Sequence, residues 1–175
     1  AAAQNLCPVT LELGGKAPAI VLDDFPLRTA AERISFVKLL NAGQICTTVD
    51  HAWLPQGKID EFVQLAKEIV PARYPEIGTV DYTSIIDQRA FDRLVHAMDD
   101  ARERGATLIT LLPGAPYDAA TRKINPTIVL NAPEDCVLLQ REIFGPILPL
   151  RGYTQLETVI NKINAGPRPL AIYPF

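Results

Sequence analysis

The sequence predicts an α/β fold with a mostly parallel sheet and helices on both of its faces. Short apolar runs typical of strands alternate along the chain with longer amphipathic segments typical of helices. Parallel neighbours in a sheet need a crossover element between them, and the intervening helices supply it. The 175 residues are 48% hydrophobic and 21% charged, a composition that can bury one ordinary core. We therefore expect one domain.

The predicted strands are bounded by turn residues. Val9–Leu13 alternates apolar and polar residues and ends at Gly14-Gly15, which is typical of a strand that leaves through a turn. His51–Leu54 is closed by Pro55, and Leu112–Asn125 is the most loop-like stretch. The other strand candidates are Ala19–Leu22, Thr107–Leu112, Ile128–Leu130, Ile147–Leu150 and Leu170–Tyr173.

Four predicted helices each carry an apolar stripe. The first runs from about Leu27 to Asn41 and ends at Ala42-Gly43, where glycine can take the left-handed conformation. The second ends before Pro71, the third is capped by Asp87 and ends at Gly105, and the fourth starts at a capping box of Thr154 and Glu157. The stripes are, in chain order, Ala30, Ile34, Phe36, Val37, Leu39 and Leu40; Ile59, Phe62, Val63, Ala66, Ile69 and Val70; Phe91, Leu94, Val95 and Met98; and Leu156, Val159, Ile160 and Ile163.

Charge, hydropathy and cysteine content exclude several classes of function. The net charge of −3 argues against a nucleic-acid partner, which needs a clustered basic face. No apolar run reaches the roughly 18 residues of a membrane span, and no secretory signal is present. Cys7, Cys46 and Cys136 are an odd number at wide spacing, which favours a reducing cytoplasm over a disulfide framework. His51 and His96 lack a second plausible ligand nearby, so we expect no metal site.

The two ends of the sequence suggest a segment of a longer protein. The chain begins at Ala1 rather than at methionine, and it stops at Phe175, directly after the last predicted strand. A natural small domain usually has more punctuation at its termini. We therefore expect residues 1–175 to be one domain taken from a larger chain.

The first candidate for chemistry is Glu12, in the motif Leu-Glu-Leu-Gly-Gly-Lys. Its carboxylate comes at the end of a predicted strand, beside two glycines that let other backbone approach. Sites in α/β proteins lie at the carboxyl ends of parallel strands, so Glu12 is a candidate acid–base residue. From this motif alone, a surface glutamate at a tight turn is the simpler interpretation.

The second candidate is Cys46, in the stretch Asn41–Thr48. A cysteine just beyond a buried helix, in a loop that contains glycine, can be exposed enough to act as a nucleophile. A nearby base or a helix dipole would be needed to form the thiolate. A buried structural cysteine is the alternative, and this is what most free cysteines are.

The third candidate is the pair Glu142 and Phe144, which lies before Gly145-Pro146. The pair offers a hydrogen-bond acceptor and a flat apolar surface, which would suit a ribose and a nicotinamide ring. An ordinary turn with one core phenylalanine is the alternative for this motif on its own.

Taken together, these motifs resemble those of the aldehyde dehydrogenase superfamily. The resemblance covers the chain from Val9 to Phe175, and within it Asn41–Asp50 and Arg168–Phe175 look most like the class 3 branch, which includes coniferyl aldehyde dehydrogenases. The motifs that occur in the order and approximate spacing of the superfamily are Leu-Glu-Leu-Gly-Gly-Lys, Gly-Gln-x-Cys, Glu-Ile-Phe-Gly-Pro and Arg168–Tyr173.

The resemblance implies a role for each candidate residue. Cys46 would attack the carbon of a small aldehyde, and a hydride would pass to NAD or NADP. Glu12 would then activate the water that hydrolyses the thioester on Cys46, which releases a carboxylic acid. The backbone N–H of Cys46 would donate to the developing oxyanion. Glu142 would bind the nicotinamide ribose, Phe144 would pack near the nicotinamide, and Gly14 would belong to the same cofactor-binding set.

The resemblance also implies what these residues lack. The dinucleotide-binding fold, the oxyanion asparagine and the oligomerisation strand of the family would lie outside residues 1–175, so this segment alone would be inactive. The full-length enzyme would be a cytoplasmic homodimer or homotetramer without a nucleic-acid or membrane partner. Cys7 and Cys136 match no catalytic position, and we expect them to be structural. The aldehyde and the choice between NAD and NADP stay open.

Three alternatives remain open at the level of sequence. An acylating enzyme or one with a phosphorylated substrate would belong to the same superfamily, but Glu12 speaks against an enzyme that acylates coenzyme A. A cofactor-independent thiol esterase would need only an exposed Cys46. A non-catalytic binding domain would give no reason to keep Glu12, Cys46 and Glu142 together.

Overall fold

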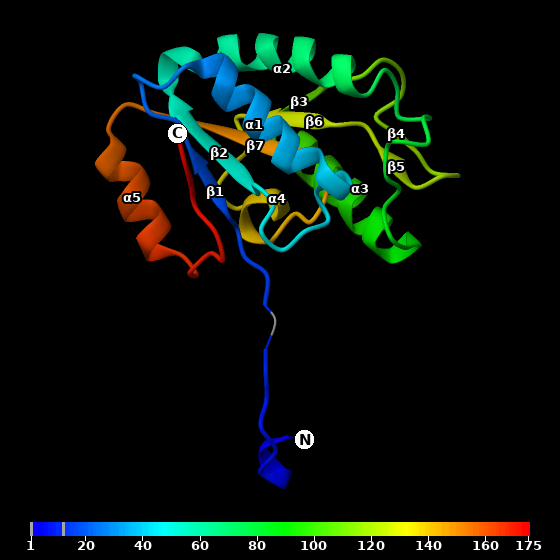
Figure 1. Ribbon diagram of the computed structural model, residues 1–175, viewed down its shortest axis with the longest axis vertical. Coiled ribbons are helices and arrows are strands. Elements are labelled where there is room, and N and C mark those ends of the chain that lie inside the picture. Colours follow the sequence, from blue (N-terminus) through cyan, green and yellow to red (C-terminus); the bar gives the residue numbers. More distant parts are fainter. Residues whose placement is uncertain (1, 12) are drawn as a thin grey trace.

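The computed structural model describes residues 2–11 and 13–175 (Figure 1). Within them, six strands form one sheet in the order β3-β6-β7-β2-β1-β8, in which β3 and β6 are antiparallel and the other neighbours are parallel. The predicted α/β fold with a mostly parallel sheet is thus confirmed. The strands are β1 (Pro18–Ile20), β2 (His51–Pro55), β3 (Thr107–Thr110), β6 (Thr127–Leu130), β7 (Ile147–Tyr153) and β8 (Tyr173–Pro174).

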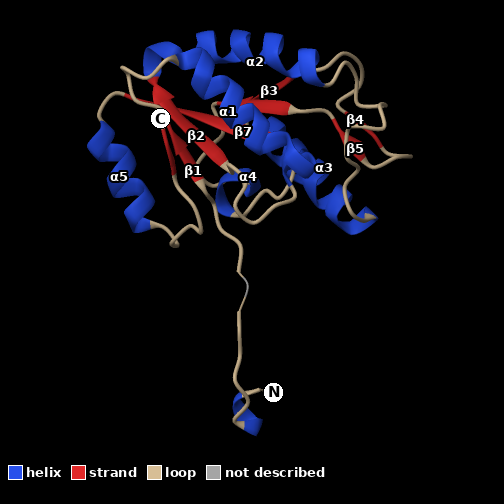
Figure 2. Ribbon diagram, viewed as in Figure 1, coloured by secondary structure: helices blue, strands red, loops and turns tan. Residues whose placement is uncertain are grey.

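Helices cover both faces of this sheet (Figure 2). The helices α1 (Leu27–Leu39) and α2 (Ile59–Arg73) pack on one face, and α3 (Gln88–Glu103) and α4 (Val137–Gln140) pack on the other. The fifth helix, α5 (Leu156–Ala165), shares the second face, because its Lys162 lies over the Trp53 ring of β2. Short 3-10 helices span Ala3–Asn5 (η1), Leu40–Gly43 (η2) and Gln56–Lys58 (η3).

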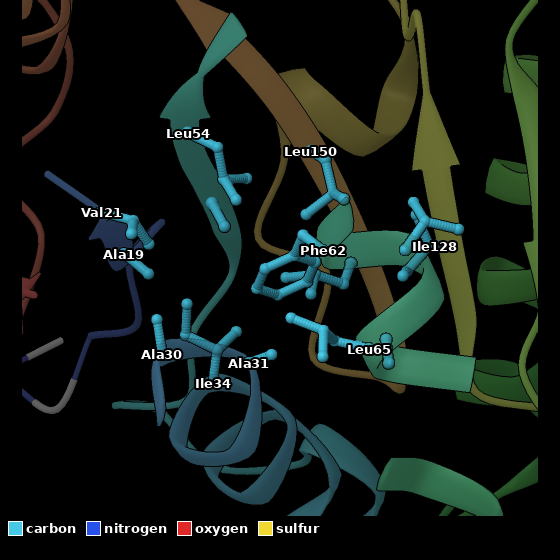
Figure 3. Packing of buried hydrophobic residues seen from close by; sticks show 14 of the residues in the cluster. Ala19, Val21, Ala30, Ala31, Ile34, Leu54, Phe62, Leu65, Ile128 and Leu150 are labelled. Carbon is cyan, nitrogen blue, oxygen red and sulfur yellow. The ribbon is translucent and has the colours of Figure 1, made fainter. Parts of the chain in front are cut away.

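Alternation along the strands divides the core into two clusters. In β6, Ile128 faces the α1 and α2 side, whereas its neighbour Val129 faces α3, because successive side chains of a strand point to opposite faces. Figure 3 shows the first cluster, in which Ile34 of α1 and Phe62 of α2 meet Leu54 of β2. Each of these three side chains is fully buried.

The apolar stripe of α1 is confirmed in part. Ala30 and Ile34 are buried as predicted, but Phe36 is 47% exposed. Lys38 is buried in its place, at 2% exposure. The α-helix also ends earlier than predicted, at Leu39, and continues as η2 to Gly43, whose φ of +74° is left-handed as expected.

Of the other predicted helix ends, one is confirmed and two are wrong. Asp87 caps α3 as predicted, since its side chain accepts a hydrogen bond from the amide of Ala90 at 2.7 Å. The predicted end of α2 before Pro71 is wrong, because a single missing amide does not break the last turn, and Tyr74 still donates to the carbonyl of Val70. The capping box of α5 is also wrong: Gln155 occupies the cap position, so Thr154 lies one residue too early.

The strand predicted at Val9–Leu13 is wrong for the described part of that range. Its residues extend away from the body of the fold (Figure 1), and Val9, Leu11 and Leu13 are more than half exposed. A strand needs a neighbour to satisfy its backbone groups, and none of the described strands pairs with this segment. The sheet therefore begins at Pro18.

The stretch predicted as most loop-like, Leu112–Asn125, contains only the two-residue strands β4 (Tyr117–Asp118) and β5 (Lys123–Ile124). The described helices include none that is both long and apolar enough to cross a membrane.

Candidate active site

The four sequence motifs lead into four parallel strands of the sheet. Residues 14–17 precede β1, residues 43–50 precede β2, residues 141–146 precede β7, and residues 168–172 precede β8. Parallel strands carry their amino ends to one edge of a sheet, so the motifs gather at that edge. The expectation that the glutamate motif follows the carboxyl end of a strand is therefore wrong. Glu12 itself lies outside the described residues.

The Gly14-Gly15 pair lies against the two motifs from the second half of the chain. A Cβ atom on Gly14 would lie 1.9 Å from Oε2 of Glu142, so only glycine leaves room for that carboxylate. A Cβ atom on Gly15 would lie 3.2 Å from Cα of Pro169. Residues far apart in the sequence thus lie in direct contact at this edge.

A buried ion pair fixes the loop that carries Glu142. Lys16 pairs with Asp50, and its ammonium also donates to the carbonyl oxygens of Leu138 at 2.8 Å and Arg141 at 2.9 Å. The second carboxylate oxygen of Asp50 accepts from the amide of Ile143 at 2.8 Å. The loop is therefore held on both sides of Glu142.

The charge of Asp50 is retained despite its burial. Burial by itself would raise the pKa of Asp50, but contact with His51 and the charges of Lys16 and Lys38 outweigh it and hold this pKa below its ordinary value. An ionised Asp50 can accept hydrogen bonds from both Lys16 and Ile143 at the same time.

Helix α3 also holds the loop that carries Glu142. The guanidinium of Arg93 donates to the carbonyl oxygen of Ile143 at 2.8 Å and to that of Glu142 at 3.4 Å. Gly145 packs directly on Leu94, because a Cβ atom there would lie 2.6 Å from a methyl group of that leucine. The loop is thus held by α3 as well as by Asp50, which directly precedes β2.

Cys46 is exposed, so the alternative of a buried structural cysteine is wrong for this residue. Its loop closes as a turn in which the amide of Thr48 donates to the carbonyl of Ile45 at 2.9 Å. The hydroxyl of Thr48 also donates to the carbonyl of Val37 at 2.9 Å, and the Tyr173 hydroxyl donates to the carbonyl of Thr47. The thiol therefore sits on a turn that is anchored to α1 and to β8.

The other two cysteines differ in burial. Cys136 is fully buried in the cluster beneath α3, in agreement with a structural role. Cys7 is exposed in the amino-terminal segment, and its thiol contacts only the carbonyl of Asn5.

The loop that bears Cys46 touches the loop that bears Glu142. A Cβ atom on Gly43 would lie 2.4 Å from the carbonyl oxygen of Gly145, so glycine is required there by contact as well as by its positive φ. The side chain of Gln44 holds the same loop to a third segment, since it donates to the carbonyl of Ser84 and accepts from the amide of Ile86. Gly43 and Gln44 thus shape the loop of Cys46, as the sequence predicted.

Phe144 lies at the surface, where it was expected to offer a flat apolar face. It is 37% exposed, its φ is +51°, and it lines a cavity of about 250 Å³ together with Asn41, Gln44 and Ile86. The alternative of a core phenylalanine is therefore wrong. The ring faces a cavity whose other wall comes from the loop of Cys46.

Oε1 of Glu142 and Nζ of Lys38 are buried near this edge without a hydrogen-bond partner among the described residues. Burial lowers the pKa of Lys38 to about 8, although the negative charges of Asp50 and Glu142 act to raise it. An unpaired buried acceptor such as Glu142 Oε1 is the kind of group that a ligand donor satisfies.

The family of the chain follows from its similarity to known proteins. Residues 1–173 match the model described as the aldehyde dehydrogenase family. The chain belongs to this family. It is 48% identical over its full length to a probable coniferyl aldehyde dehydrogenase of Pseudomonas aeruginosa, of which it covers 36%, and 44% identical to a coniferyl aldehyde dehydrogenase of a Pseudomonas species, of which it covers 37%.

Other members of the aldehyde dehydrogenase family support the branch that the sequence motifs indicated. The chain is 38% identical to rat aldehyde dehydrogenase family 3 member A2, over the whole chain and 35% of that protein. The resemblance to the class 3 and coniferyl branch is thus confirmed. The chain spans little more than a third of the length of these relatives.

Solved structures of aldehyde dehydrogenases share the fold described above. Substrate-bound Staphylococcus aureus AldH matches 99% of the chain with a TM-score of 0.90 at 33% identity, and the chain covers 37% of it. The NADP complex of a glyceraldehyde-3-phosphate dehydrogenase from Bacillus halodurans matches 97% of the chain with a TM-score of 0.82 at 31% identity, and the chain covers 35% of it.

Sequence reasoning missed three charged residues around this candidate site. Lys38 was hidden inside an apolar stripe, Arg93 inside an amphipathic helix, and Asp50 beside a strand. Only Asp50 could have been found from the sequence, because its carboxylate lies between the apolar Val49 and a predicted strand of mostly apolar residues. Such a residue needs a buried partner, but the partner lies 34 positions away, at Lys16.

Proposed function

We propose that residues 1–175 form the thiol-bearing catalytic domain of an enzyme that oxidises an aldehyde to a carboxylic acid with NAD or NADP. The observation that carries this proposal is the contact between the loop of Cys46 and the loop of Glu142 and Phe144. It puts the loop that bears an exposed thiol against the loop that bears an unpaired carboxylate oxygen and an apolar ring. The names of the relatives support aldehyde oxidation as the reaction.

The chemistry begins at the sulfur of Cys46. The thiolate adds to the aldehyde carbon, and the backbone N–H of Cys46 donates to the oxyanion that develops on the aldehyde oxygen. A nicotinamide held by Glu142 and Phe144 would supply the acceptor for the hydride of this carbon. The Cys46 adduct is then a thioester, and Glu12 takes a proton from the water that hydrolyses it. The carboxylic acid leaves and the thiol is regenerated.

The residues at the sheet edge fit a nicotinamide nucleoside. Glu142 Oε1 is buried and unpaired among the described residues, so a ribose hydroxyl that donates to it would remove the cost of an orphan acceptor. Gly14 makes room for this carboxylate, and Phe144 offers an apolar surface beside the cavity. The chain's own contribution is thus to hold the ribose and to align the ring beside Cys46.

The finer features of the proposal concern the whole enzyme. The dinucleotide-binding fold, the oxyanion asparagine and the oligomerisation strand would lie outside residues 1–175. The whole enzyme would be a homodimer or a homotetramer. Residues 1–175 alone are then expected to show negligible turnover. The names of two relatives favour an aromatic aldehyde of the coniferyl type as substrate.

The decisive experiment compares two exposed cysteines in the whole enzyme that carries these residues. Cys46→Ser should abolish both aldehyde-dependent formation of NADH or NADPH and the acyl adduct seen by mass spectrometry. Cys7→Ser should retain both, since Cys7 is exposed but lies in the amino-terminal segment. Retention of the adduct in Cys46→Ser would exclude Cys46 as the nucleophile.

A cofactor-free ester assay separates oxidation from the esterase alternative. If the enzyme hydrolyses a chromogenic ester through Cys46 but forms no NADH or NADPH from any aldehyde, the thiol esterase is the correct function. Absence of both activities, in an enzyme that folds, would favour a non-catalytic binding domain.

A further inference from the structure

A second cavity, of about 160 Å³, lies between β2, β7 and α5. It opens on the face of the sheet opposite α1 and α2, because Trp53 points away from the cluster that holds its neighbours Ala52 and Leu54. It shares no lining residue with the cavity beside Phe144. Its walls combine apolar side chains with cations: Trp53, Leu139, Ile163, Pro167 and Pro169 with Lys16, Arg151 and Lys162.

The indole of Trp53 holds two of these cations. Trp53 of β2 lies opposite Arg151 of β7 in the parallel register, and the guanidinium carbon is 4.2 Å from the ring centroid. The ammonium of Lys162, on α5, is 6.0 Å from the same centroid. Both distances lie within the range of cation–π attraction, so the two positive charges are fixed at the cavity wall.

Hydrogen-bond donors in this cavity outnumber the acceptors that meet them. The guanidinium of Arg151 has five N–H groups but makes one hydrogen bond among the described residues, to Glu134. Lys162 donates to the same carboxylate oxygen. Nε1 of Trp53 is buried and has no partner in the described part of the chain. Unused donors of this kind cost free energy when they are shielded from water.

The charges at this wall do not cancel. Arg151 and Lys162 face a single carboxylate, Glu134, whose side chain is 60% exposed. Lys16, the third cation, is already neutralised by Asp50 and is further bound by two carbonyl oxygens. His51 is uncharged at neutral pH, because burial lowers its pKa. One positive charge is therefore left over beside an apolar wall.

We propose that this cavity binds a small carboxylate with an apolar body, such as an aromatic acid. The carboxylate accepts hydrogen bonds from the unused donors of Arg151 and Lys162, and the apolar body lies against Leu139 and Ile163. A bare oxoanion meets only the cationic half of the cavity and binds less tightly. The inference does not depend on the proposed oxidation, because the binding of a carboxylate can be measured without turnover.

The test uses the indole N–H signal of Trp53 in a two-dimensional ¹H–¹⁵N NMR titration of the intact protein. The signal is assigned by its loss in Trp53→Phe. Benzoate should shift it saturably, whereas benzamide, its uncharged counterpart, should not. Inorganic phosphate should bind at least 10-fold more weakly than benzoate. An equal response to benzamide would show that the positive charge plays no part, and tighter binding of phosphate would refute the apolar half of the site.

Two variants of the charged wall should change the affinity for benzoate in opposite directions. Arg151→Met should weaken benzoate binding at least 10-fold, and Glu134→Gln should tighten it several-fold, because it removes the competing carboxylate. A folding defect cannot produce tighter binding, so the second variant keeps the test decisive. Lys67→Met, an exposed lysine of α2, is the matched control and should change the affinity less than 2-fold. Unchanged affinity in both Arg151→Met and Glu134→Gln would overturn the proposal.

Discussion

The amide of Ile143 donates a 2.8 Å hydrogen bond to the carboxylate of Asp50, although 93 residues separate them in the chain. Through this bond and the ion pair with Lys16, one buried carboxylate ties the start of β2 to the loop of Glu142. The geometry of the candidate active site thus depends on a residue that is not itself part of the chemistry.

Asp50→Ala is expected to destabilise the fold and weaken cofactor binding. It leaves the ammonium of Lys16, whose side chain is 24% exposed, without its counter-ion and the Ile143 amide without an acceptor. Breaking a buried pair costs about 3–5 kcal/mol, measured as a loss in the free energy of urea unfolding. Asp135→Ala is the control, because its ion pair with Arg104 is exposed, and it should cost less than about 1 kcal/mol. Equal losses would show that the Asp50 contacts carry no special stability.

Gly14→Ala is expected to raise the KM for NAD or NADP at least 10-fold in the whole enzyme. The new methyl group would meet the Glu142 carboxylate at 1.9 Å and push it from the place where we propose that it holds ribose. The KM for the aldehyde should change much less. Gly57→Ala provides the matched control, since a Cβ atom there meets nothing within 4 Å. A normal cofactor KM in Gly14→Ala would argue against the role of Glu142.

Gly43→Ala tests the contact between the two loops. The substitution combines a left-handed φ of +74° with a Cβ atom 2.4 Å from the Gly145 carbonyl oxygen. The first effect costs about 1–2 kcal/mol and the second about 1–3 kcal/mol more. Gly114→Ala isolates the first effect, because Gly114 has a φ of +97° and open space around it. Calorimetric unfolding should show a larger loss in Gly43→Ala, and no difference between the two would contradict the contact.

Lys38→Met is expected to stabilise the fold in a pH-dependent way. Since burial lowers the pKa of Lys38 from 10.5 to about 8, the unfolded chain binds more protons between these values. The wild-type free energy of unfolding therefore rises as pH increases from 8 to 10.5, as the cost of the buried charge disappears. Below pH 8, Lys38→Met should be more stable by about 3 kcal/mol, and the gain should vanish near pH 10.5.

Denaturant titrations at pH 7 and at pH 10.5 measure this difference. Lys67→Met, on the exposed surface of α2, is the control and should show the same small effect at both values. A gain in Lys38→Met that does not change with pH would indicate better packing rather than relief of a buried charge.

Particular residues show how far the sequence could predict the site. The motifs of Cys46 and Glu142 could be recognised in the sequence, because each combines a functional side chain with a nearby glycine. The contacts of Gly14 with Glu142 and of Gly43 with Gly145 were not readable, because they join segments more than 100 residues apart. The strand expected at Val9–Leu13 failed for a related reason: alternation indicates a strand only where a neighbouring strand is present to pair with it.

The sequence by itself determined the α/β class, the helices from their stripes and the chemical identity of the candidate groups, because periodicity and residue type are local properties. Only the tertiary structure decided that the motifs meet at the amino edge of the parallel strands, that Asp50 and Lys16 hold them there, and that Trp53 and Arg151 face a separate cavity. These relationships arise from strand order and register, which depend on contacts between distant residues and therefore cannot be read from any single stretch of the chain.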